Sequence, residues 1–237
     1  MIEIAISLAV IAFAVVAIIG VLPAGLNVQR ENREDTLVNQ DGPYFLEAIR
    51  SGAQGFDNLT SFVDQVVIVF TNTSVASITN APPFSGSNIV GWLSIPRGAK
   101  FNGDPVQKVQ AYIHSPSGAA GEQGKGARDL AFNYLLTVEI VPFANFAVNT
   151  TNYLAYPTNT VEYAMAEARY LQSAQLTNNL YDVRLTFRWP VLPNGELGNG
   201  RQVYRAQLSG QQIQSKTPSG TILPFYYFAP QNYVRSQ

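Results

Sequence analysis

The chain has no cysteine and only one histidine, His114, among its 237 residues. Without cysteine it can form no disulfide framework, thiolate nucleophile, cysteine-ligated zinc site or iron–sulfur centre. A serine triad would have to use His114, yet the sequence contains no Gly-x-Ser-x-Gly motif, and Ser115-Pro116 predicts a solvent-exposed turn at this histidine. We therefore predict no catalytic residues and no enzymatic activity.

Charged residues are also scarce, at 13% of the chain, and the net charge is −1. Such a chain lacks the basic footprint of a dedicated nucleic-acid-binding protein. Its carboxylates show no calcium-loop spacing, and the glycine-rich segment 118–126 lacks the Ser or Thr that follows the lysine of a phosphate loop. We expect no cofactor, no metal site and no specific nucleic-acid binding.

The chain does contain one long uncharged run, Ile4 to Leu26, directly after Glu3. At about 1.5 Å per helical residue the run reaches roughly 35 Å, enough to cross a hydrocarbon core of about 30 Å. The remaining residues contain no comparable run, so we expect one soluble unit on one side of a membrane. A carboxylate at the tip of such a helix is costly to bury and calls for a partner charge.

Three interpretations of this N-terminus are open. A secretory signal peptide has a basic start and a small-x-small cleavage site, whereas Glu3 is acidic and Leu22-Pro23-Ala24 fits poorly. A plain single-pass anchor explains the length of the run but leaves Glu3 unexplained. A helix that assembles with other helices accounts for both features.

The segment Met1-Ile-Glu-Ile-Ala-Ile-Ser-Leu-Ala-Val-Ile-Ala-Phe resembles the N-termini of mature type IV pilins and type II secretion pseudopilins. In that family a prepilin peptidase removes a short basic leader, the new N-terminal amine is methylated, and a glutamate pairs with the amine of a neighbouring subunit. By this resemblance Glu3 is the pairing glutamate. The family usually has it fifth in the mature chain, so we expect two further residues upstream of Met1 or a shifted register.

Small residues recur at helical spacing along the run in two strips, Ala5, Ala9 and Ala12, followed by Ala17, Gly20 and Ala24. Such strips allow helix backbones to approach closely. Gly20 and Pro23 predict a kink or a loosened turn at residues 19–23. The predicted assembly residues are Glu3, Ala5, Ala9, Ala12, Gly20 and Pro23.

Beyond the run, residues 27–39 are polar and compatible with a helix, and Asp41-Gly42-Pro43 predicts a break near residues 41–43. A new helix from Pro43 would place Phe45, Ala48 and Ile49 in an apolar stripe. We therefore predict a helical stalk over residues 1–54, with residues 1–26 as its membrane or filament-core part.

Residues 55–237 predict a β-rich head. Short β-branched or aromatic runs bounded by Pro, Gly, Asn and Ser predict strands at 65–72, 88–95, 107–114, 134–141, 181–189 and 202–208. The last two form a hairpin around residues 193–200, and Val161 to Leu176 is a helix candidate. The predicted fold class is α+β, with a long pilin-like N-terminal helix packed on an antiparallel sheet.

The resemblance implies a structural subunit of an extracellular type IV pilus-like filament, a helical homo-oligomer that lies in the bacterial inner membrane before assembly. Its partners would then be a prepilin peptidase and the pilus assembly machinery. Two alternatives stay open at this point: a minor pseudopilin of a type II secretion system, and a single-pass membrane-anchored binding module.

Overall fold

A computed structural model describes residues 2–52, 56–72, 74–79, 85–101, 103–118, 132–143, 154–192 and 194–233. The chain divides into two compact units, Met1–Gln40 and Asp41–Gln237. The second unit includes the last turns of the N-terminal helix, whereas the stalk predicted from the sequence ends at residue 54. The glycine-rich segment 118–126 lies outside the described residues, apart from Gly118.

A single helix, α1, runs from Ile2 to Arg50. The predicted break at residues 41–43 is wrong, because Gly42 and Pro43 are both helical. Proline removes one helical hydrogen bond, and this cost is offset by the turns that follow, where Phe45, Ala48 and Ile49 are completely buried.

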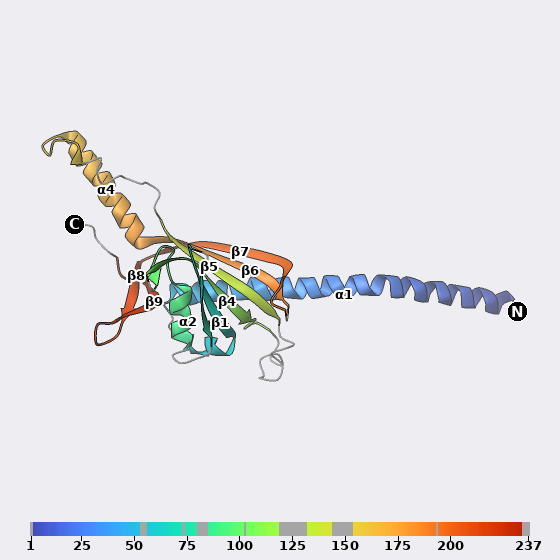
Figure 1. The fold of residues 1–237 in the computed structure, drawn as a ribbon. Helices are drawn as coiled ribbons and strands as arrows, with labels where there is room; N and C mark the ends of the chain where they lie inside the picture. Colours follow the sequence, from blue (N-terminus) through green and yellow to red (C-terminus); the bar gives the residue numbers. More distant parts are fainter. Residues whose placement is uncertain are drawn as a thin grey trace. The chain divides into compact units, whose positions relative to one another are not determined.

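The head is built on an antiparallel sheet with strand order β2-β1-β4-β5-β6-β7, with β3 paired to β4 (Figure 1). Two further strands, β8 and β9, form a separate antiparallel pair. The predicted α+β layout is confirmed. The strands are β1 Val63–Phe70, β2 Val75–Thr79, β3 Lys100–Phe101, β4 Asp104–His114, β5 Asn133–Pro142, β6 Leu180–Val191, β7 Leu197–Ser209, β8 Gln211–Lys216 and β9 Ile222–Ala229.

Alternation along β6 separates the two faces of the sheet. Val183, Leu185 and Phe187 are completely buried, while Arg184 and Arg188 between them are exposed. The predicted hairpin is confirmed, because β6 pairs with β7 along almost its whole length. One face of the sheet therefore covers the core, and the other carries charged side chains.

Residues 88–95, predicted as a strand, are mostly helical, and that prediction is wrong. The helix is α2, Gly86–Leu93, and it begins where the Ser85 hydroxyl oxygen accepts a hydrogen bond from the Asn88 N–H at 3.2 Å. Trp92 packs against Phe225 of β9, with ring centroids 5.2 Å apart. Packing on several sides suits the apolar composition of α2 better than a place in the sheet does. A short 3₁₀ helix, η1 at Asp57–Ser61, precedes β1.

The second predicted helix is confirmed as α4, Val161–Asn179. The Thr160 hydroxyl oxygen caps it by accepting a hydrogen bond from the Tyr163 N–H at 3.2 Å. None of its residues is buried. The helix ends where β6 begins, and Figure 1 shows it leading away from the sheet from that point.

Candidate assembly surface on the N-terminal helix

The N-terminal part of α1 carries an exposed apolar surface. Every side chain from Ile2 to Arg33 is exposed, including Phe13 at 78%. By length and composition this is a helix that could cross a membrane. An apolar helix of this length is stable only when lipid or other protein covers it.

Helical geometry sorts the predicted assembly residues into two groups. At about 100° per residue, five of them fall within an arc of about 80°, and the sixth faces the opposite side. The five are Ala5, Ala9, Ala12, Gly20 and Pro23, and the sixth is Glu3. The structure therefore brings the small residues together on one face and separates them from the carboxylate.

Gly20 and Pro23 lie within α1, which continues as a helix through residues 19–23, and the predicted kink there stays a prediction. Pro23 has no N–H, and the carbonyl oxygen of Ile19 therefore receives no hydrogen bond from that position. No atom lies within 4 Å of a β-carbon placed on Gly20. Any restriction on a larger side chain at Gly20 must come from a molecule that covers the helix.

Glu3 lies in the first turn of α1, where a carboxylate interacts favourably with the helix dipole. The Ser7 hydroxyl donates to the Glu3 main-chain carbonyl at 2.9 Å and leaves the carboxylate untouched. Within the part of the chain that the structure describes, the Glu3 carboxylate has no ion-pair partner. This side chain can therefore accept a charge supplied from outside.

A charged segment follows the apolar surface. The Nε of Arg30 lies 2.8 Å from Oε1 of Glu34, one helical turn further on. The Arg30 side chain is 71% exposed and that of Glu34 is 14% exposed, and water around the arginine limits the stability that the pair contributes. The pair lies in the part of α1 that follows the apolar surface, where charged and polar side chains can be hydrated.

In the head, the one completely buried carboxylate among the described residues is that of Asp41. Its Oδ2 accepts hydrogen bonds from the hydroxyl groups of Ser115 at 2.7 Å and Tyr134 at 2.8 Å. Its Oδ1 accepts one from the Ser117 N–H at 3.1 Å. These bonds join the end of α1 to β5 and to the segment after β4.

Burial of the Asp41 carboxyl group raises its pKa above the ordinary value, although the hydrogen bonds from Ser117, Ser115 and Tyr134 act in the opposite direction. Burial, followed by the nearby Asp41 charge, raises the pKa of Tyr134 well above its ordinary value. The tyrosine therefore stays protonated and acts as a hydrogen-bond donor to the carboxylate.

Asp41 is a residue that sequence reasoning missed as a buried contact, because it was assigned to a helix break. The available signal was its spacing: Phe45, Ala48 and Ile49 follow it at i+4, i+7 and i+8, so Asp41 belongs to the stripe that faces the core.

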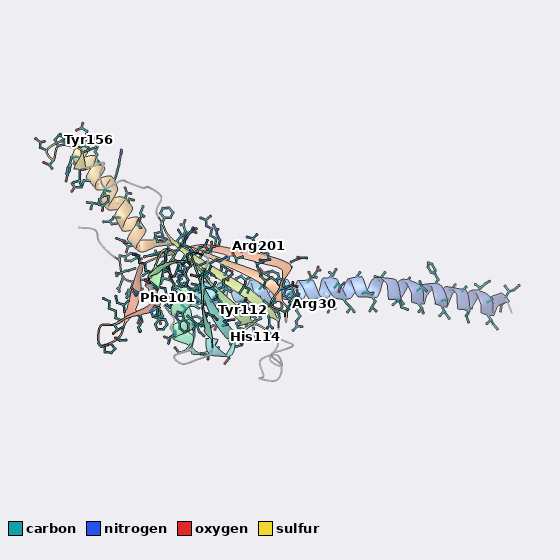
Figure 2. All side chains as sticks on the ribbon, in the orientation of Figure 1. Arg30, Phe101, Tyr112, His114, Tyr156 and Arg201 are labelled. Carbon is teal, nitrogen blue, oxygen red and sulfur yellow. The ribbon has the colours of Figure 1, made fainter. Side chains whose placement is uncertain are left out.

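His114 also differs from the prediction. It ends β4 rather than lying in an exposed turn, and its side chain is only 14% exposed (Figure 2). Its Nδ1 lies 2.8 Å from Oδ2 of Asp64, which is an ion-pair distance without hydrogen-bond geometry. Across the described ranges, no group of three or more His, Asp or Glu side chains could hold a metal ion.

No family model, curated protein or solved structure matches the chain. Two features of the chain bear on its function. One is a membrane-length helix with an exposed apolar surface and a carboxylate at its start, and the other is an α+β head that includes the last turns of the same helix.

Proposed function

We propose that this chain is a structural subunit of a type IV pilus-like filament, held in the bacterial inner membrane before assembly and extracellular afterwards. The observation that supports this is the exposed apolar surface of α1 with Glu3 at its start. Processing by a prepilin peptidase and export by a pilus assembly machinery belong to the same proposal.

Lipid alone accounts for only part of this surface. Lipid tails cover the apolar side chains, but they offer Glu3 no cation, and an unpaired carboxylate buried among them costs several kcal/mol. A neighbouring copy supplies a cation in its N-terminal amine. Association of helices therefore accounts for the carboxylate as well as for the apolar run.

The distribution of residues around α1 supports contacts with more than one neighbour. The face with Ala5, Ala9 and Ala12 permits close helix approach, and Glu3 lies on the other side. A helix that uses two different faces makes heterologous contacts, and such contacts build open filaments unless their rotation closes a ring. A subunit of this kind acts by assembly rather than by catalysis.

The test compares Glu3→Gln with Glu31→Gln, which removes a carboxylate from the same helix outside the apolar run. Fibres are sheared from cells that express the full chain and are examined by negative-stain microscopy. The fibre yield is then divided by the amount of the protein in the membrane. We expect fibres from the wild type and Glu31→Gln, and a large loss for Glu3→Gln at an unchanged membrane level.

Mass spectrometry of the fibre N-terminus adds a second readout, since the proposal requires a processed and methylated amine. Normal fibre yield from Glu3→Gln, or a wild-type chain that stays in the membrane and never forms fibres, contradicts the proposal.

A further inference from the structure

The outer face of the head sheet carries two arginines that face each other across neighbouring strands. Arg188 of β6 is the direct partner of Arg201 of β7, and both side chains are exposed. Like charges opposite each other destabilise a sheet. Among the described residues neither arginine has an ion-pair partner, so the two guanidinium groups lack a counter-charge.

A second arginine pair on the same face is neutralised internally. Arg184 faces Arg205, and each has its own carboxylate. The Nη1 of Arg184 lies 3.6 Å from Oε2 of Glu139, and the Nε of Arg205 lies 2.7 Å from Oδ1 of Asp182. The contrast leaves Arg188 and Arg201 as the pair that can receive an anion.

The same two carboxylates decide what kind of anion fits. Four residues of a strand span about 13 Å, so a long polyanion lying along β6 from Arg188 would meet Glu139 and Asp182. There Arg184 and Arg205 are already paired with these carboxylates, so a continuous polyanion gains no net attraction from that part of the face. A single carboxylate, held by two guanidinium forks, satisfies Arg188 and Arg201 without the need for a longer anion.

A carboxylate in a suitable setting lies at the start of α4. Glu162 is exposed, and it stands within about 100° around the helix from Val161, 66% exposed, and Met165, 59% exposed. Just before the helix, Tyr156 is 45% exposed, and Figure 2 labels it at the end of α4 remote from the sheet. The start of α4 thus combines one acidic group with exposed apolar side chains.

The start of α4 is far from the arginine pair of its own chain. The helix joins β6 at Leu180, and its 19 residues place Val161 about 27 Å from that junction along the helix axis. Since α4 has no buried residue, and Figure 1 shows it leading away from the sheet, the start of this helix is open to contact with another molecule.

We propose that the start of α4 in one copy docks on the outer face of β6 and β7 in the next copy. Glu162 lies between the guanidinium groups of Arg188 and Arg201, and Met165 packs against Val203, which is 42% exposed and two residues from Arg201 on the same face. Charge complementarity between these two surfaces identifies a second copy as the occupant. The inference rests on the proposed filament.

The two docking surfaces differ from each other, so the contact is heterologous and can repeat from copy to copy along the proposed filament. This contact joins heads, and it is separate from the contact between N-terminal helices. Loss of the head contact therefore leaves the N-terminal helix and its membrane insertion intact.

The first test is a charge exchange in the full chain. Arg201→Glu and Glu162→Arg each lower the yield of sheared fibres about tenfold or more, because like charges meet in the contact. The double variant restores most of the yield. Arg97→Glu and Glu167→Arg are matched controls elsewhere in the head and on the other side of α4, and both keep wild-type yield.

The second test keeps every charge and uses the absence of cysteine from the chain. Met165→Cys combined with Val203→Cys is treated with a short bismaleimide in intact fibres. We expect a ladder of dimers, trimers and longer products, because each copy carries both halves of the contact. Either single-cysteine variant gives no ladder.

The outcomes separate the two proposals. Wild-type cells that make no fibres overturn the proposed function and this contact with it. Fibres that form normally but show no ladder with the double-cysteine variant, or charge variants without rescue, overturn the contact alone. A ladder together with charge rescue supports both.

Discussion

Replacement of Asp41 by alanine tests whether the buried carboxylate joins α1 to the sheet. The change leaves three donors without an acceptor: the hydroxyl groups of Ser115 and Tyr134, and the N–H of Ser117. A buried donor without a partner costs about 1–3 kcal/mol, which applies to the two hydroxyl groups, whereas the partly buried Ser117 N–H costs less. We therefore expect the free energy of unfolding of the head to fall by about 3–6 kcal/mol, a large part of the stability of a typical domain.

Tryptophan fluorescence can follow this loss in the full chain. The only two tryptophans, Trp92 and Trp189, lie in the head and are 4% and 5% exposed. Their emission reports unfolding of the head while detergent keeps the apolar helix in solution. Urea titration of the wild type and Asp41→Ala then gives the difference directly.

Asp41→Asn adds a pH test. Because the folded state raises the pKa of Asp41, its contribution to stability is fully present below the unfolded value of about 3.8 and is lost as the pH rises through the folded pKa. Asparagine does not titrate. The stability of the wild type relative to Asp41→Asn should therefore fall as the pH rises above about 4.

Two results refute this reasoning. One is a head whose stability changes by less than about 1 kcal/mol in Asp41→Ala, which means that the three donors find other partners. The other is a stability difference between the wild type and Asp41→Asn that rises with pH, which requires the opposite sign of the pKa shift.

Further variants test neighbouring features with the same titration or with fibre yield. Tyr134→Phe removes one hydrogen bond to a charged acceptor and should cost about 1.5–3 kcal/mol. Gly210 has φ +122°, and an added β-carbon would lie 2.7 Å from the Cα of Pro230, so Gly210→Ala should lower the free energy of unfolding by about 2–5 kcal/mol. Gly98 has φ +87° but open space around it, so Gly98→Ala should lower it by only about 1–2 kcal/mol. Gly20→Leu should leave the stability of the head unchanged, because no atom lies near that position within one chain, and should lower fibre yield through the covered helix face.

The sequence predicted the parts of the fold whose local pattern and final environment agree. In β6, apolar residues alternate with polar or charged ones from Val183 to Arg188, and the strand has one buried and one solvent-exposed face. The helix at Val161 is likewise marked by a Thr160 cap and a helix-favouring composition. At such positions the tertiary structure adds nothing that contradicts the pattern.

Prediction failed where distant contacts decide the local structure. Ile89 and Val90 favour a strand by propensity, but burial of α2 against β9 and η1 makes a helix the better arrangement. Gly42 and Pro43 are helix breakers, yet the helix continues because Asp41 finds donors far along the chain, in Ser115 and Tyr134. Neither set of contacts can be derived from a short stretch of the sequence, because the partners lie far apart along the chain.

The candidate site divides in the same way. The apolar run and its small-residue face follow from composition and helical spacing, so they could be predicted in full. The arginine pair could not, because the opposition of Arg188 and Arg201 depends on the register of β6 and β7. Register is fixed by the whole hairpin, so the positions of the arginines in the sequence do not show which of them face each other.

The continuity of α1 has a mechanical consequence. A pulling force applied to the apolar segment enters the head along a single helix, with no loop to extend first. Inside the head the force meets buried Phe45 and Ile49, and the three hydrogen bonds of Asp41. Because these contacts share the load and must break together for the helix to slide out, the end of α1 resists extraction as one cooperative unit.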